Sequence, residues 1–476
     1  MSLGTLARSA LLSGIAGAFA VSGCSGSEDP GGAVATGAAA ISATADVVFT
    51  NPLRLPSVLS GSTAYNLTIE SGTAQMKPGN ATPVVGFNGT FPGPTIVATR
   101  GQTITVTQKN AWSENVSIHN HGHKVAASSD GHPVDYITPG ASKVYTYTND
   151  QPAGTFWYHD HTMDVTGSHV YHGLAGFYII HDPAEDSLGL PSGDYDVPLL
   201  LQDKSFDTNN GLTFTDNGPF FGDTPVVNGT ANPVLDVANR KYRFRLLNGS
   251  NVRPWSLSLT AGTAASFQVI GSDGGLLTAP VSVTSLSMYP AERYDIVVDF
   301  SKYPVGTTLS LSNADTTAPA IKTLMQFRVS GTETDTSTVP SALATITRLE
   351  EADAKAKANI TLSTAGGVWE LDGLTYDPSR IDLTSTTGAV TIWTLTNNSP
   401  LTHPFHKHLT EFNILDVNGQ APSAAQNGLK DTVQVPANGT ARIIFKNETF
   451  TGTYVFHCHL LDHEDNRMML QEGVTQ

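Results

Sequence analysis

The chain has 476 residues, which is long enough for about three domains and too long for one hydrophobic core. With 44 glycines, 27 prolines and only 14% charged residues, the composition predicts short strands joined by tight turns and argues against a helical bundle. The formal net charge of -16 excludes nucleic acid as a favoured partner, because phosphate binding needs clustered Lys and Arg.

Residues 1–48 are predicted to be an export leader followed by a flexible tether. The first part has one basic residue, Arg8, and an apolar run that is too short for a membrane span and typical of a signal peptide. The run ends in Val21-Ser22-Gly23-Cys24, which resembles a bacterial lipoprotein cleavage box, and a plain cleaved signal is the alternative. We therefore expect an exported, periplasmic or cell-surface protein, with a membrane tether through lipidated Cys24.

Residues 49–186 are predicted to form the first domain. Alternating apolar and polar residues predict strands at 103–107 and 143–147. Two His-x-His motifs, at His119/His121 and at His159/His161, are expected to lie at strand ends.

Residues 187–335 are predicted to form a second domain, with strands at 242–247 and 294–300. Between His181 and His403 the sequence has no histidine, and Cys458 is the only cysteine beyond residue 24. A domain without imidazole or thiolate ligands cannot hold a copper site, so we expect it to act as a spacer and a substrate wall.

Residues 336–476 are predicted to form the third domain. Strands are expected at 390–395 and 440–445, whereas residues 349–360 contain helix-forming residues that can equally form a solvated link.

The sequence His457-Cys458-His459 is the most informative stretch of this third domain. Side chains alternate along a strand, so the two histidines face one way and Cys458 faces the other. Cys458, His463 and Met468, with His403 as the second histidine, make the soft ligand set of a blue-copper centre. Met469 is a rival to Met468, and a lone cysteine is more commonly a small buried hydrophobe.

Histidines are strongly clustered. Random placement of 15 histidines gives about 0.5 His-x-His pairs, yet the chain has five, which start at 119, 121, 159, 406 and 457. Ordinary core histidines therefore do not explain the pattern.

The four segments 118–122, 157–161, 403–408 and 457–468 resemble, in order, the copper signatures of the multicopper oxidase family. The resemblance is closest to its bacterial spore-coat laccase and bilirubin-oxidase-like branch, and it extends to Gly173–Pro183 and Pro290–Asp295. It implies an all-β fold of three consecutive cupredoxin-like Greek-key β-barrel domains, with a three-copper cluster between the first and third.

The resemblance also implies a role for each motif residue, with four copper ions in all. The type 1 copper would be bound by His403, Cys458, His463 and Met468. The type 2 copper would be bound by His119 and His406. The type 3 pair would be bound by His121, His159, His161, His408, His457 and His459.

Two carboxylates, Glu464 and Asp130, resemble the acidic positions that relay protons to the cluster in bacterial members of the family. For Asp130 the alternative is a simple turn at Ser129-Asp130-Gly131.

These features predict a laccase-like oxidase that takes single electrons from small phenolic or aromatic donors and reduces O2 to water. A Cu(I) or Mn(II) oxidase is the enzymatic alternative, although seven methionines without a Met-rich segment disfavour Cu(I). A copper-binding electron carrier is the alternative from another class, and it leaves the two early His-x-His motifs unexplained. We expect a monomer.

Overall fold

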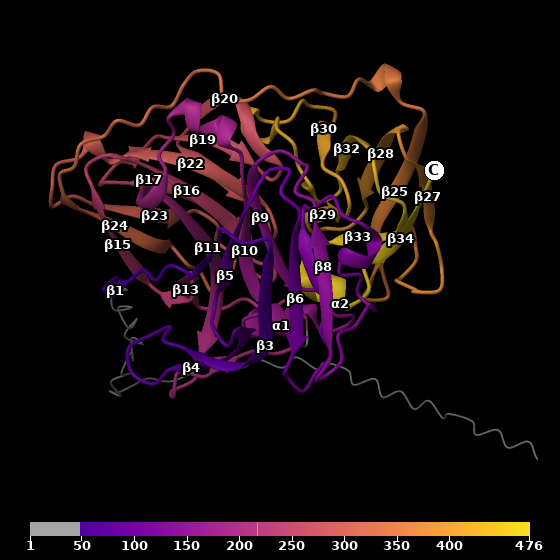
Figure 1. Ribbon diagram of the computed structural model, residues 1–476, viewed down its shortest axis with the longest axis horizontal. Coiled ribbons are helices and arrows are strands. Elements are labelled where there is room, and N and C mark those ends of the chain that lie inside the picture. Colours follow the sequence, from indigo (N-terminus) through magenta and orange to yellow (C-terminus); the bar gives the residue numbers. More distant parts are fainter. Residues whose placement is uncertain (1–47, 217) are drawn as a thin grey trace, which may run out of the picture. The chain divides into compact units, whose positions relative to one another are not determined.

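The computed structural model describes residues 48–216 and 218–476, and these residues are organised as six β-sheets. In Figure 1 the strands of residues 58–181 are indigo and purple, those of residues 196–331 are magenta to salmon, and those of residues 356–475 are orange to yellow. The prediction of an all-β protein is confirmed. The predicted leader lies outside the described residues, apart from its last residue, Val48.

The first pair of sheets contains a four-stranded sheet, β4-β3-β6-β8, and a five-stranded sheet, β2-β5-β10-β9-β7. Its strands are β2 (Val58–Leu59), β3 (Ala64–Ala74), β4 (Thr82–Phe87), β5 (Gly93–Thr99), β6 (Ile104–Asn110), β7 (Ile118–His121), β8 (Ser142–Tyr147), β9 (Gly154–Asp160) and β10 (Ala175–His181). Both predicted strands, 103–107 and 143–147, are confirmed within one residue as parts of β6 and β8.

The second pair contains the sheet β1-β15-β24-β23-β17-β18, with β21 on β17, and the sheet β14-β13-β11-β16-β22-β19-β20, with β12 on β11. Its strands are β1 (Asn51–Pro52), β11 (Asp196–Phe206), β12 (Leu212–Thr213), β13 (Thr224–Val227), β14 (Thr230–Ala231), β15 (Pro233–Ala238), β16 (Lys241–Asn248), β17 (Trp255–Thr260), β18 (Ala264–Ala265), β19 (Phe267–Ser272), β20 (Gly275–Val283), β21 (Ser285–Met288), β22 (Arg293–Asp299), β23 (Thr308–Asn313) and β24 (Thr323–Gly331). The short strand β1 thus joins this middle pair although it precedes the first pair in the chain.

The third pair contains two five-stranded sheets, β26-β25-β28-β32-β30 and β27-β34-β33-β29-β31. Its strands are β25 (Ala356–Ala365), β26 (Val368–Leu371), β27 (Leu383–Thr386), β28 (Val390–Asn397), β29 (His403–Lys407), β30 (Phe412–Val417), β31 (Thr432–Val435), β32 (Thr440–Lys446), β33 (Gly452–Cys458) and β34 (Met469–Thr475). The predicted strands 390–395 and 440–445 are confirmed in β28 and β32.

Helices are few and short in the described part of the chain. The two α-helices are α1 (Thr166–His172) and α2 (Leu461–Asp465), and the 3-10 turns are Ala127–Ser129, Pro183–Leu188, Gly193–Tyr195, Phe300–Lys302, Glu351–Asp353 and Ala424–Gln426. The helix considered for residues 349–360 is wrong, because residues 356–362 pair in parallel with β28 and sheet pairing overrides the local helix preference. None of these described helices has the length and apolar character needed to cross a membrane.

Each pair of sheets encloses its own apolar core. Tyr65 and Tyr145 of one sheet pack with Phe156 of the other in the first pair. Phe244 packs with Trp255 in the middle pair. In the third pair the core contains Cys458 and Met468 beside the larger aromatic and aliphatic side chains, so two of the predicted type 1 ligands lie in a buried apolar interior.

Candidate metal centres

Strand pairing brings the His-x-His motifs together within each outer domain. In the first domain β7 runs antiparallel to β9, and His119 lies directly opposite His159. In the third domain β29 runs antiparallel to β33, and His406 lies directly opposite His457. Because residues two apart in a strand face the same side, each strand pair presents four imidazoles on one face. The prediction that the two early motifs lie at strand ends is confirmed.

The two sets of four imidazoles meet each other. His119 stacks on His408 with ring centroids 3.8 Å apart, and His121 stacks on His406 at 3.7 Å. Three groups of cluster histidines have ligand nitrogens within 4.8 Å of one another, namely His119/His121/His159, His119/His406/His408 and His161/His408/His457. His459 completes the set, with its ring 5.1 Å from that of His121 and 5.4 Å from that of His159. All eight predicted cluster ligands therefore converge.

The cluster has the donor pattern that a metal site requires. Each of the eight histidines is at most 1% exposed, yet several ring nitrogens have no hydrogen-bond partner, among them His119 Nε2, His121 Nδ1, His159 Nε2 and His406 Nε2. A buried polar atom without a partner costs about 1–3 kcal/mol. Copper accepts imidazole nitrogen well, so these residues fit the copper ions that the sequence predicts.

Burial keeps most of these rings in the neutral form that binds metal. Burial lowers the pKa of His121, His406 and His408 well below the usual value, and the neighbouring imidazoles lower each of them further. The pKa of His159 is lowered to about 4 for the same reasons. Neutral imidazole is the ligand form, so these four rings need not lose an extra proton before they bind a metal at neutral pH.

Three carboxylic residues each orient one histidine from the first domain and one from the third. Asp130 accepts a hydrogen bond from His408 Nδ1 at 2.8 Å through its side chain, and one from His119 Nδ1 at 2.6 Å through its backbone carbonyl. Burial raises the pKa of Asp130 to about 7. The residue also belongs to the turn ending at Gly131, so the turn and the contact with the cluster coexist.

Glu464 is the second of these residues. Its oxygens lie 2.7 Å from Nδ1 of His161 and 3.2 Å from Nδ1 of His457. Burial raises the pKa of Glu464, but the two imidazoles outweigh this and the net shift is well downward. The carboxylate therefore favours a proton on both Nδ1 atoms, which leaves both Nε2 atoms free to face a metal.

Asp431 is the third, and sequence reasoning missed it. Its Oδ1 lies 3.0 Å from His121 Nε2, and its carbonyl accepts a hydrogen bond from His406 Nδ1 at 2.8 Å. The residue immediately precedes β31 and carries no recognisable motif. The one signal in the sequence is the pair of charges Lys430-Asp431 directly before an apolar strand.

The predicted type 1 residues form a separate group inside the third domain. Cys458 Sγ lies 3.3 Å from His403 Nδ1 and 3.7 Å from His463 Nδ1, and the two Nδ1 atoms are 3.3 Å apart. Burial raises the pKa of the Cys458 thiol well above its usual value. A coordinating metal ion would deprotonate this thiol outright, so the group suits a metal centre better than a free nucleophile.

Met468 is better placed than Met469 for the fourth position. Its side chain is fully buried in the same core cluster as Cys458, whereas Met469 packs in another cluster with Tyr376 and Val455. The Met468 carbonyl also accepts a hydrogen bond from the Cys458 amide at 3.1 Å. The helix α2, which carries His463, lies between Cys458 and Met468 in the sequence.

Two further residues contact the type 1 group. Trp369 stacks on the His463 ring at 4.0 Å, with 22° between the planes. Ser399 Oγ lies 2.7 Å from His403 Nε2. Neither residue was singled out from the sequence, because nothing in the local pattern around residues 369 and 399 marks a ligand environment.

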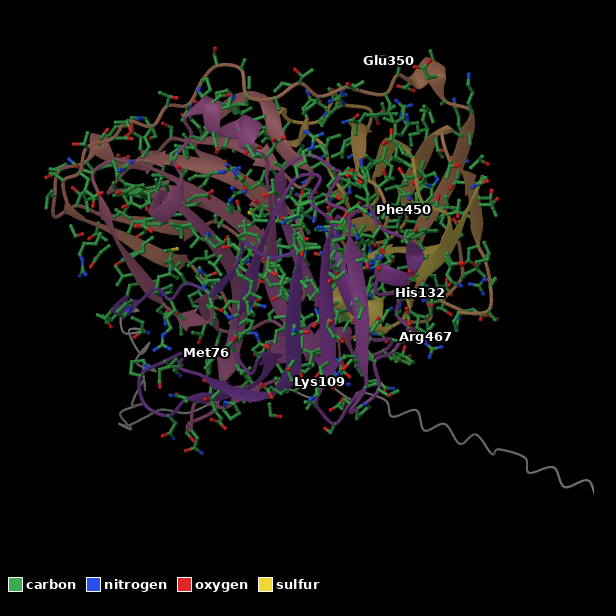
Figure 2. The ribbon with its side chains drawn as sticks, viewed as in Figure 1. Met76, Lys109, His132, Glu350, Phe450 and Arg467 are labelled. Atoms are coloured by element: carbon green, nitrogen blue, oxygen red, sulfur yellow. The ribbon has the colours of Figure 1, made fainter. Side chains whose placement is uncertain are left out.

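The histidines that were assigned no copper have other contacts. His132 Nε2 lies 2.9 Å from Gln471 Oε1 of β34, and His132 is labelled in Figure 2. His169 Nδ1 lies 2.9 Å from Asp160 Oδ2, and the His169 ring packs edge-on against Trp112. The other three are buried His123, partly buried His172 and more exposed His181.

Comparison with known proteins supports this arrangement. Models of the multicopper oxidase family match residues 68–185, 196–326 and 338–475. A laccase from Bacillus subtilis is 34% identical over 87% of this chain and 94% of its own length. A bilirubin oxidase from Albifimbria verrucaria is 36% identical over 86% of this chain and 76% of its own length. The crystal structure of the multicopper oxidase McoA from Aquifex aeolicus superposes with a TM-score of 0.85 at 33% identity, covering 90% of this chain and all of that one.

The three pairs of β-sheets, the histidine cluster and the type 1 group, together with these relatives, thus define an oxygen-using oxidoreductase with cupredoxin-like domains. The chain belongs to the multicopper oxidase family, whose members bind four copper ions and act on small-molecule donors and O2. The resemblance, the fold class and the copper cofactor expected from the sequence are confirmed.

Proposed function

We propose that the protein is a laccase-like oxidase of phenolic or similar aromatic donors, with the ligand roles given by the four motifs. The observation that carries this proposal is the position of Cys458. Its sulfur lies in the group with His403 and His463, and its chain neighbours His457 and His459 lie in the histidine cluster. A single stretch of backbone therefore joins the site that receives electrons to the site where oxygen is reduced.

Bound copper would supply one-electron redox chemistry, in which four ArOH molecules and one O2 give four ArO radicals and two H2O. The chain itself has to hold the ligands, exclude water and supply protons. The reduction consumes four protons in a buried cluster, and the phenolic donors release the same number at the surface. Groups that carry protons inward are therefore needed.

Asp130 and Glu464 are the proposed proton carriers. Each carboxylate is buried and contacts cluster histidines directly. Because burial raises the pKa of Asp130 to about 7, this carboxyl group can hold a proton near neutral pH and release it. Glu464 has the depressed pKa described above and would act mainly by orienting His161 and His457, passing a proton only transiently.

The surroundings of the type 1 group favour aromatic donors. Trp369 covers one face of His463, and Val368, its chain neighbour, is 44% exposed. Leu401, two residues before His403, is 42% exposed. Exposed apolar side chains beside a redox site suit the flat, apolar body of a phenol or aromatic amine better than a hydrated ion.

A metal oxidase is the second candidate, and one observation favours it. A small cavity beside α2 is lined by Asp216, Asp462 and Asp465, with the aromatic rings of Phe214 and Phe220. Asp462 adjoins His463 in the chain, and its Oδ1 is buried without a hydrogen-bond partner. Carboxylate oxygens are the ligands that Mn(II) prefers, so this cavity offers a route for electrons from a hard cation.

The experiment is oxygen uptake by the copper-loaded protein with a phenol, bilirubin, Cu(I) and Mn(II) as separate donors. We expect the phenol to have the highest kcat/KM. Asp216→Asn should lower turnover of Mn(II) and leave turnover of the phenol unchanged. A higher kcat/KM for a metal ion, lost in Asp216→Asn, would replace the first candidate by the second. Absence of oxygen uptake with every donor would contradict both and would leave the electron-carrier alternative.

We further propose that the protein is exported and anchored by a lipid on Cys24. The support is the leader pattern in residues 1–24 alone. Expression with a radiolabelled fatty acid tests it, because Cys24→Ala should lose the label and move the protein from the membrane to the soluble fraction. A wild-type chain that carries no label would contradict the lipid anchor.

A further inference from the structure

The motif Pro290–Asp295 of the middle domain places an arginine beside the histidine cluster. Arg293 begins β22, and its side chain is fully buried. Its guanidinium donates two hydrogen bonds to Asp431 of the third domain, from Nη1 to Oδ1 at 2.7 Å and from Nη2 to Oδ2 at 2.5 Å. This paired geometry fixes the plane of the carboxylate as well as neutralising its charge.

The carboxylate that Arg293 fixes belongs to the residue that orients two proposed ligands. Asp431 contacts His121 through Oδ1 and His406 through its carbonyl, as described above. The ring nitrogens left over, His121 Nδ1 and His406 Nε2, are both buried and have no hydrogen-bond partner. The position of Asp431 therefore decides which nitrogen each ring presents to a metal.

The middle domain also holds the backbone around Asp431. Asp273 Oδ2 accepts hydrogen bonds from the amides of Asp431 and Thr432 at 3.2 and 3.3 Å. Lys430 Nζ lies 3.0 Å from Asp273 and 2.9 Å from Glu292 Oε1. These contacts clamp the start of β31 against β22 and the end of β19.

In the first domain a glycine lies where a side chain would collide with Arg293 and Asp431. Gly122, which follows the first His-x-His motif, has a φ of +87°, and a Cβ there would lie 2.6 Å from Asp431 Oδ2 and 3.0 Å from Arg293 Nη2. Arg293 Nε also donates to the Thr155 carbonyl of β9 at 3.0 Å. All three domains thus meet at one guanidinium, next to the cluster.

We propose that Arg293 is a positioning residue for the three-copper cluster, acting through Asp431 on His121 and His406. The middle domain, which the sequence predicts to be a spacer and a substrate wall, then controls metal binding in a site to which it gives no ligand. This inference rests on the ligand assignment under Proposed function. Loss of a contact that orients a metal ligand typically lowers metal affinity 10–100-fold.

The test is Arg293→Lys, which keeps the positive charge and loses the paired hydrogen bonds. The matched control is Arg253→Lys, because Arg253 is equally buried in the same domain and donates to Asp203, Gly222 O and Thr317 O, outside the histidine cluster. Copper content, the type 1 absorption and the type 2 paramagnetic resonance signal are measured during titration with a chelator. We expect Arg293→Lys to lose cluster copper at about 10–100-fold lower chelator concentration, with the type 1 absorption retained, and Arg253→Lys to behave as wild type.

Asp431→Asn should weaken cluster copper in the same way, and the double variant should be no weaker than the worse single one, because both changes break one contact. Equal retention of cluster copper in Arg293→Lys and wild type would overturn the proposal. A parallel loss of type 1 copper, cluster copper and the folded circular dichroism spectrum would also overturn it, because Arg293 would then serve the fold alone. A wild-type protein without cluster signals would instead contradict the ligand assignment.

Discussion

The type 1 group and the histidine cluster are built in opposite ways. The type 1 residues all come from the third domain, and Cys458, His463 and Met468 lie within eleven residues of one another. The cluster takes four histidines from residues 119–161 and four from residues 406–459, and its orienting contacts come from all three domains. The type 1 group is therefore complete within one domain, whereas the histidine cluster forms only when the domains are assembled.

This difference decides how each site responds to change. A substitution in the type 1 group should act locally, because its neighbours belong to one apolar core. A substitution around the cluster should act on residues distant in sequence, because each of the three orienting acidic residues contacts one histidine from each outer domain. The following four predictions test this contrast.

The largest effect is expected for Cys458→Ser. Removal of the thiolate should abolish the type 1 absorption and all measurable donor oxidation, while the cluster keeps its copper. Visible spectroscopy, oxygen uptake and copper analysis measure these three quantities. Met469→Leu is the control, because Met469 packs away from the type 1 group and should leave the colour unchanged. Unchanged phenol oxidation in Cys458→Ser would refute the electron route.

Glu464→Gln should have the next largest effect. The amide has one acceptor oxygen and one NH2 donor, so it cannot face a protonated Nδ1 on both His161 and His457 as the two carboxylate oxygens do. We therefore expect kcat to fall about 10–100-fold with the type 1 absorption intact. Glu411→Gln is the matched control, because Glu411 is equally buried but pairs with Lys124. Equal activity in both variants would remove Glu464 from the site.

Trp369→Leu should have a smaller, purely local effect. Loss of the stack on His463 should lower kcat/KM for phenolic donors by up to about tenfold, because such an aromatic contact is worth about 0.5–1.5 kcal/mol. Cluster copper should stay at the wild-type level. A simultaneous loss of cluster copper, seen by copper analysis, would contradict the separation of the two sites.

The smallest effect concerns Lys204, which lies outside both sites between the rings of Phe91 and Tyr171. Burial lowers the pKa of Lys204 from 10.5 to about 7, so between these values the unfolded chain binds a proton that the folded chain lacks. The stability of the folded protein should therefore rise with pH across this window. Lys204→Met should show a smaller rise in thermal midpoint between pH 7 and pH 9 than wild type, measured by calorimetry. Equal slopes would show that Lys204 keeps its charge when buried.

Sequence patterns were sufficient to predict the strands and to place pairs of histidines on one face, because both depend on short-range alternation. The copper-binding roles of these histidines come from the family resemblance and remain predictions. Alternation along Thr440–Phe445 predicts a strand, and a histidine two residues from another predicts two imidazoles on one face. The same reasoning misjudged residues 349–360, where helix-forming residues gave no sign of the parallel neighbour β28. Local helix and strand preferences do not show which distant strands will pair.

Asp431 and Arg293 were missed as functional residues for a similar reason. Arg293 was noticed only as part of a family-like segment, and Asp431 was not noticed at all. They are 138 residues apart, and their significance arises only when β22 and β31 come together beside His121. Asp130 and Glu464 were predicted because they resemble acidic positions of the family, and their role in proton transfer remains a prediction. The domain limits and the leader remain predictions.

The histidine rings of the first and third domains stack on one another, so copper binding and domain docking are coupled. Because His119 stacks on His408 and His121 on His406, neither outer domain expressed alone can present more than half of the eight imidazoles. Copper that binds all of them binds only the docked form, so free metal stabilises docking by mass action. Withdrawal of copper by a chelator should therefore loosen the junction between residues 119–161 and 406–459 before either sandwich melts.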